Sequence, residues 1–72
     1  MTEQAIIERA EITAFARLAH TLSRISVQKT MWARTAKQLG MHDKADHFFA
    51  EAARFRSDAN WYLRKAQDRY HG

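Results

Sequence analysis

The side chains best suited to chemistry lie in one short segment near the middle of the chain. Four potential metal ligands form two pairs spaced four residues apart: His42, Asp43, Asp46 and His47. On a helix this spacing places each pair on one face, and Glu51 follows one turn later. A chain folded back on itself would set Arg34 and Lys37 opposite, with no further carboxylate to complete a site. We therefore expect helix capping and surface ion pairs here, with no metal ion.

Groups for nucleophilic catalysis are also scattered. The chain has no cysteine, and none of its serines at 23, 26 and 57 has a nearby histidine with an orienting carboxylate at helical spacing. General acid and base chemistry needs convergent groups in a cleft that excludes water. We expect no catalytic residues, no cofactor and no small-molecule substrate, so the chain should not be an enzyme.

The composition favours a single helical domain over residues 1–72. The chain has 72 residues, two glycines, no proline and a net charge of +4. Scarce glycine and proline exclude a turn-rich β fold. No apolar run of about 18 residues is present, and the first eleven residues carry three glutamates where a signal peptide is basic and then apolar. We expect a soluble cytoplasmic protein that makes no membrane contact.

One glycine divides the chain into two helices. Gly40 is placed to close the first helix as its C′ residue, and Asp43 to act as the N-cap of the second. The segments 3–39 and 43–70 are rich in helix-forming residues and contain no glycine or proline apart from this turn. The fold prediction is all-α, a long antiparallel helical hairpin. The alternative is a three-helix bundle with a break near 23–26, where two serines could cap a new helix.

A seven-residue repeat predicts how the two helices pack. In the second helix Ala45, Ala52, Ala59 and Ala66 recur at one heptad position, and a large residue follows each by three. Folding at Gly40 then predicts antiparallel layers whose residue numbers add to 84. The layers are Leu39 with Ala45, Ala36 with Phe48, Trp32 with Ala52, Lys29 with Phe55, Ile25 with Ala59, Leu22 with Tyr62, Leu18 with Ala66, and Phe15 with Arg69. Five of these set a bulky residue against an alanine, which keeps the core volume constant.

Self-association is expected because two helices bury too little apolar surface to be stable at this length. If paired residue numbers add to 84, Glu11 would face a position beyond residue 72. Ile6, Ile7 and Ile12 lie outside the seam, the line of predicted layer residues along the first helix. We expect these isoleucines in the interface of a homodimer that forms a four-helix bundle. The alternation of alanine and bulky layers resembles that of the Rop family of plasmid copy-number regulators, dimeric hairpins that bind RNA. The resemblance covers the packing pattern of the second helix and implies architecture alone.

The turn carries a second resemblance, limited to a helical hairpin. Gly40, Ala45, Phe49 and Ala52 are spaced as in the turn of a tetratricopeptide repeat. One copy cannot form a solenoid, so this resemblance implies no more than two paired helices.

The outer side of the first helix is a candidate partner surface. Residues 12–42 contain no acidic residue and carry five Lys and Arg. The heptad places six residues opposite the seam: Arg17, His20, Arg24, Val27, Met31 and Arg34. They form either an ordinary solvated face or a docking stripe with an apolar pair framed by arginines. Trp61 lies on the back of the second helix. It packs in the dimer or under the overhanging N-terminal residues, or it anchors a partner.

These features predict a small non-enzymatic regulatory or inhibitory protein that binds a protein partner with an acidic or apolar groove. The contact residues expected are Arg17, Arg24, Val27, Met31, Arg34 and Trp61. One alternative is a nucleic-acid-binding dimer, for RNA or DNA, that uses the same arginines. The second alternative is a structural subunit of a larger assembly. The small size and basic charge are also compatible with a phage or mobile-element protein.

Overall fold

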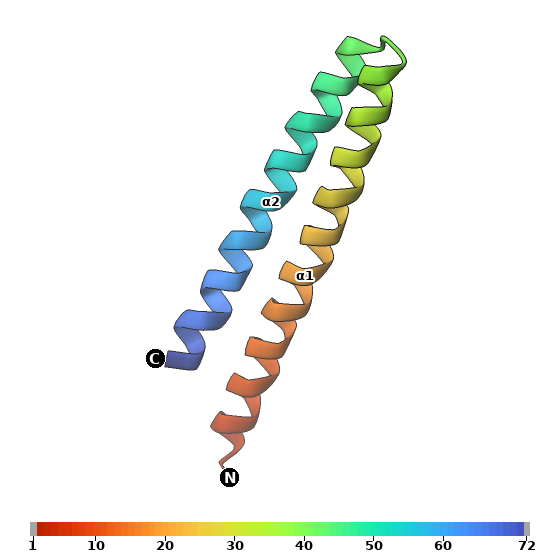
Figure 1. Ribbon diagram of the computed structural model, residues 1–72. Coiled ribbons are helices and arrows are strands. Elements are labelled where there is room, and N and C mark those ends of the chain that lie inside the picture. Colours follow the sequence, from red (N-terminus) through yellow and green to blue (C-terminus); the bar gives the residue numbers. More distant parts are fainter. Residues whose placement is uncertain (1, 72) are drawn as a thin grey trace.

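The protein is a two-helix hairpin in the computed structural model, which describes the backbone of residues 2–71 and the side chains of residues 2–69. Helix α1 spans Glu3–Gln38 and helix α2 spans His42–His71. The helices run antiparallel side by side (Figure 1), and the molecule measures 58 × 14 × 12 Å. The predicted hairpin is confirmed, and each helix end lies within one residue of its predicted position.

Helix α1 is unbroken through Ser23 and Ser26, so the three-helix alternative is wrong. Both serines sit inside a long run of helix formers, and Ser26 is turned into the interface between the helices, where it does not cap a helix. The start of α1 is capped instead by Thr2, whose Oγ1 accepts a hydrogen bond from the Ala5 N–H at 3.2 Å. Sequence analysis did not single out this cap.

The connection between the helices is a Schellman turn centred on Gly40. Gly40 has a φ of +77°, in the left-handed region that favours glycine. Its N–H donates to the Lys37 carbonyl at 3.1 Å, and the Met41 N–H donates to the Ala36 carbonyl at 2.8 Å. The predicted role of Gly40 is therefore confirmed. Asp43 was expected as the N-cap, but α2 already begins at His42, and Asp43 lies within the first turn.

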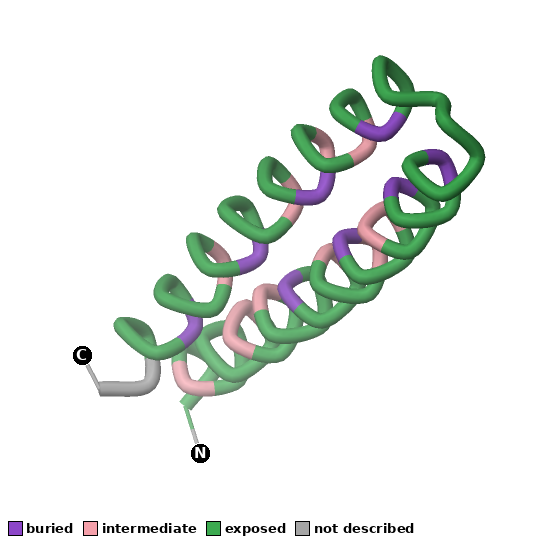
Figure 2. The backbone as a smooth tube through the Cα atoms, turned by 45° about the horizontal axis from the view of Figure 1, so that its top comes forward, coloured by how far each residue is buried: buried purple, intermediate pink, exposed green. Residues whose placement is uncertain are grey.

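Among residues 2–69, only small side chains are buried between the helices. Figure 2 shows the buried residues as one line along the inner side of each helix. They are Ala19, Ser26, Ala33 and Ala36 on α1 and Ala45, Ala52, Ala59 and Ala66 on α2. The buried Ser26 Oγ donates a hydrogen bond to the Ala52 main-chain carbonyl at 2.8 Å. A side chain this short reaches the opposite backbone only where the two helices approach closely.

The register differs from the predicted layers by about one helical turn. Ser26 contacts Ala52, which the prediction had paired with Trp32, and the Trp32 ring meets Phe48. The other recorded pairs across the interface are Glu11 with Arg69, Phe15 with Tyr62, Lys29 with Glu51, and Trp32 with Phe48. The residue numbers of all five pairs add to values from 77 to 80, where the predicted layers required 84.

The reason is that α1 presents a different column of residues to α2. Residues seven apart form a column along a helix. One column of α1 faces α2 as predicted: Phe15, Leu22, Lys29 and Ala36. The second column that faces α2 consists of Ala19, Ser26 and Ala33. The predicted second column was Leu18, Ile25, Trp32 and Leu39, of which Leu18, Trp32 and Leu39 are 39%, 45% and 70% exposed. A requirement for constant core volume determines which residues pair in a bundle whose layers are enclosed on all sides. A pair of helices is open at its sides, so large residues can turn outward while alanines meet.

Replacing Gly40 with alanine should destabilise the hairpin by about 1 kcal/mol, because a Cβ is disfavoured at positive φ. A Cβ at Gly40 would meet no atom within 4 Å, so the cost comes from the backbone conformation alone. Urea unfolding followed by circular dichroism measures this change. An unaltered midpoint for G40A would contradict the left-handed turn.

Replacing Ala52 with leucine should cost about 2 kcal/mol, because the larger side chain forces the helices apart where they are closest. Ala53, which is exposed, provides the matched control: A53L should leave the unfolding midpoint nearly unchanged. Equal midpoints for A52L and A53L, measured at one protein concentration, would show that the helices do not meet through Ala52.

Candidate interaction surfaces

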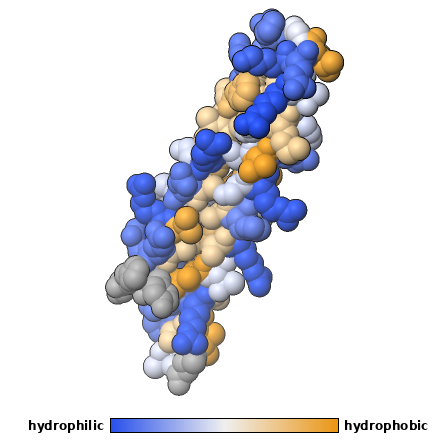
Figure 3. Space-filling model, in the orientation of Figure 1, coloured by the Kyte–Doolittle hydropathy of each residue, from blue (hydrophilic) through white to orange (hydrophobic). Residues whose placement is uncertain are grey.

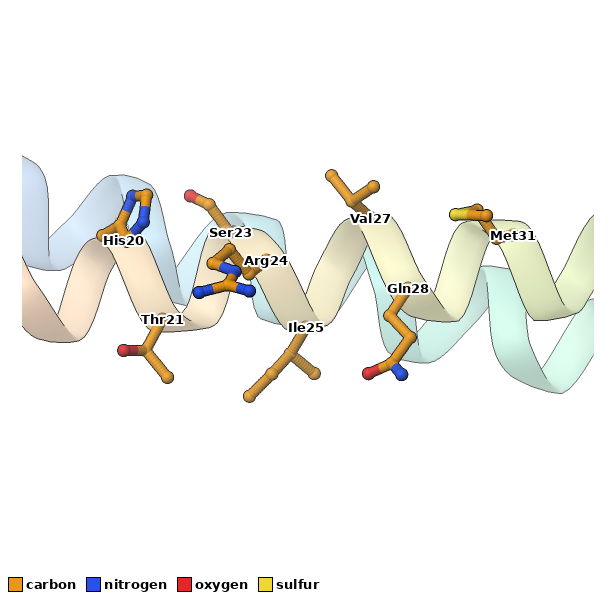
Figure 4. Close-up of a pocket in the computed structure, with 8 residues that line it drawn as sticks. All are labelled: His20, Thr21, Ser23, Arg24, Ile25, Val27, Gln28 and Met31. Carbon is orange, nitrogen blue, oxygen red and sulfur yellow. The ribbon is translucent and has the colours of Figure 1, made fainter.

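The predicted docking residues of α1 lie together on its outer side, which we call the outer stripe. Its members are Arg17, His20, Arg24, Val27, Met31 and Arg34, and every one is exposed. Val27 and Met31 are each 61% exposed, high values for apolar side chains. Figure 4 views this side of α1, with α2 behind it. The structure therefore places these six residues on the exposed outer side of α1, as predicted.

Two shallow depressions run along the outer stripe. In Figure 4, His20, Val27 and Met31 border one edge of the larger depression, Thr21, Ile25 and Gln28 border the other, and Arg24 lies between them. The second depression shares His20 and Thr21 and continues toward Ile12 and Arg17. The surface is long and open, so it suits an extended or helical segment of a macromolecule better than an enclosed small molecule.

Trp61 lies far from the outer stripe, although both were predicted as partner contacts. It is 52% exposed, and its recorded contacts are on its own helix: the Tyr62 ring at 4.9 Å and the Lys65 Nζ at 5.1 Å from the indole. By helical spacing it stands opposite Ala52, on the side of α2 that points away from α1. One flat partner surface cannot contact both Trp61 and the outer stripe.

The three isoleucines predicted for the dimer interface differ in their surroundings. Ile6 and Ile7 are 56% and 48% exposed on the first turns of α1, which extend past the end of α2 in Figure 1. Ile12 is only half-buried, and it precedes Ala19 by one heptad in the column that faces α2. The expectation that Ile12 lies off the seam is therefore wrong.

Sequence reasoning missed an apolar surface shared by both helices, which we call the aromatic face. It comprises Phe15, Leu18, Leu22, Ile25 and Trp32 of α1 with Phe48, Phe55 and Tyr62 of α2. Contacts join the helices across it: the Trp32 and Phe48 rings meet edge to face at 5.8 Å, and the Phe15 and Tyr62 rings stack at 6.1 Å. All eight residues were identified from the heptad, but they were assigned to the core between the helices.

Charge within the aromatic face is confined to one ion pair. The Lys29 Nζ lies 2.8 Å from a Glu51 carboxylate oxygen, and it also sits 5.0 Å from the Trp32 ring centre and 5.5 Å from that of Phe48. The His47 Nε2 lies 2.6 Å from the other Glu51 oxygen. The hydrogen bond from Lys29 is the largest cause that lowers the pKa of Glu51 below its ordinary value of 4.5. Desolvation, the next largest, raises this pKa, and the charges of Lys29 and His47 lower it further.

A second ion pair marks the far end of the hairpin. Arg69 pairs with Glu11, so Glu11 has an intrachain partner. The predicted layers had placed that partner beyond the end of the chain. This expectation is wrong for the same reason as the register: α2 lies about one turn further along α1 than predicted.

Among the side chains of residues 2–69, no group of three or more His, Cys, Asp or Glu is arranged to hold a metal ion. Over the same part of the chain, neither helix has a stretch long and apolar enough to cross a membrane. Along the seam, Figure 3 shows apolar atoms between the helices, with hydrophilic side chains at both edges of that view.

The chain matches no known protein-family model, and no curated protein or solved structure is detectably similar to it. Its surfaces must therefore be interpreted from their own geometry and charge. The two that stand out are the outer stripe, apolar at its centre and basic at its rim, and the aromatic face, apolar with an internally paired charge.

Replacing Lys29 with methionine should raise the pKa of Glu51 back toward 4.5, because it removes the largest cause of the shift. Since folding lowers this pKa, the ion pair stabilises the hairpin above pH 4.5, and that contribution is lost as the pH falls through the lowered pKa. Carboxyl NMR titration measures the pKa directly. The control is K37M, which removes an equal charge from an exposed lysine; if K29M and K37M give the same pKa, the proposed cause is wrong.

Proposed function

We propose that this protein is a non-enzymatic regulatory or inhibitory protein that binds a protein partner through the outer stripe of α1. The observation that carries the proposal is the pairing of Val27 with Met31, one turn apart and each 61% exposed, inside a rim of arginines. Exposed apolar side chains contribute affinity when a partner covers them, and a charged rim contributes specificity and speeds encounter.

The chemistry of the stripe describes the partner. Arg17, Arg24 and Arg34 carry no ion pair in the described part of the chain, so their guanidinium groups are available to carboxylates. An apolar groove or helix with acidic walls would match both the arginines and the apolar pair. The alternative ligand, RNA or DNA, would use the arginines but leave Val27 and Met31 without a role, which favours a protein.

The proposal assigns no catalytic role to any residue. The depressions on α1 are open and shallow, and the described residues bring together no set of acid, base and nucleophile in a closed cleft. In this proposal the acting form is a homodimer that needs no cofactor.

Affinity capture tests the proposed function. The immobilised chain is exposed to nuclease-treated and untreated cell lysate, alongside a variant carrying V27S and M31S. We expect a protein that is retained after nuclease treatment and depleted at least tenfold by the double substitution, because the apolar centre of the contact is lost. The matched control is L63S, at a position 46% exposed on α2, which should retain the same protein.

Other outcomes identify the alternatives. Capture that disappears with nuclease, falls steeply with salt and is abolished by R24E or R34E would indicate nucleic-acid binding and overturn the proposal. Capture that is equal for the native chain and the V27S/M31S variant would show that the outer stripe is not the contact surface.

A further inference from the structure

The hairpin exposes more surface than a stable monomer of its size. A compact folded chain of 8.4 kDa has an accessible surface of about 4,600 Å². This chain exposes 5836 Å², an excess of about 1,200 Å² over that expectation. Among the described residues no large side chain is fully buried. A standard protein interface covers about 800 Å² on each partner, so the excess is what one substantial interface would remove.

The aromatic face is an apolar surface to which both helices contribute, and it is only partly covered. Its side chains come from both helices and are already held together by the Trp32 to Phe48 and Phe15 to Tyr62 contacts. Trp32 and Leu18 remain 45% and 39% exposed, and the remaining members are only half-buried. Contiguous apolar surfaces on folded chains commonly mark sites of contact with another protein. The face is therefore incomplete without a second layer of helices.

Charge indicates that a second copy of the chain supplies this layer. Two copies that met through the outer stripe would bring Arg17, Arg24 and Arg34 against the same residues of the partner, which is unfavourable. On the aromatic face Lys29 is neutralised by Glu51 of its own chain, so two identical faces can approach without like charges opposed at the centre. An interface between identical surfaces must be complementary to itself, and an apolar face with an internal ion pair meets that requirement.

We propose that two copies pair through their aromatic faces and form a four-helix bundle, with Trp32 and Phe55 among the side chains buried between them. This inference rests on one part of the proposed function, the homodimer, and it assigns the interface of that homodimer. It places the interface away from Ile6 and Ile7, which lie beyond the end of α2, whereas the aromatic face brings together two exposed and six half-buried side chains along both helices.

This assembly has a consequence for partner binding. The aromatic face lies at the side of the helix pair, and the outer stripe points away from α2 (Figure 4). Pairing through the aromatic face would cover Ile25 at one edge of the larger depression but leave the six residues of the outer stripe open in each copy. The homodimer presents two stripes, and a divalent partner would bind it more tightly than one hairpin.

The two tryptophans provide a matched test on the purified chain. Trp32 and Trp61 are similarly exposed, at 45% and 52%, but only Trp32 belongs to the aromatic face. Sedimentation should give the native chain and W61D twice the 8.4 kDa mass of one chain. W32D should require at least tenfold higher concentration to associate, because it places a charge in the apolar interface. Native chain that is monomeric and helical at high micromolar concentration would overturn the proposal.

Fluorescence decides the case in which W32D fails to fold. The variant W61F keeps only Trp32, whose emission should move to shorter wavelength as rising concentration buries it in the dimer. The variant W32F keeps only Trp61, whose emission should stay that of an exposed indole at every concentration. Emission from Trp32 that does not depend on concentration overturns the proposal, and so does a dimer lost in an I6S/I7S variant but retained in W32D.

The result is independent of the partner assay. The dimer test uses the purified chain alone, and the V27S/M31S variant, altered only on the outer stripe, should sediment as the native dimer. Failure of the dimer test would remove the assigned interface without changing the outcome of affinity capture.

Discussion

The close approach of two helices through alanine and serine is the constraint from which the remaining structure follows. The buried hydrogen bond from Ser26 to the Ala52 carbonyl, at 2.8 Å, requires that the two backbones be near each other at mid-length. At that separation no large side chain fits between the helices. Phenylalanine, leucine and tryptophan side chains must therefore lie at the sides of the pair, where they remain partly open to water.

This arrangement changes where stability has to come from. Burying alanines removes little apolar area from water, and a surface ion pair such as Lys29 with Glu51 contributes little by itself. The helix ends are satisfied by Thr2 and by the turn at Gly40, but caps supply only about 1 kcal/mol each. The hydrophobic contribution that a protein of this length needs is still available in the side chains of the aromatic face.

The two exposed surfaces differ in charge, and this difference separates their proposed roles. The outer stripe concentrates unpaired arginines around Val27 and Met31, so it repels a second copy and attracts an acidic partner. The aromatic face carries Lys29 and Glu51 as a pair, so it is neutral toward an identical face. A single hairpin can thus present one surface suited to self-association and another suited to a different protein.

Much of this molecule was determined by local sequence. The two helices follow from runs of helix formers, the turn from Gly40, and the inward column of α2 from the repeat of Ala45, Ala52, Ala59 and Ala66. The exposure of Val27 and Met31 also follows from helical spacing. What tertiary structure alone decided is which column of α1 meets those alanines. Ser26 and Trp32 lie in columns on either side of Lys29 with the same seven-residue period, so periodicity cannot distinguish them. The choice depends on the distance between the helix axes, because only the small column allows the close approach at which Ser26 bonds to Ala52.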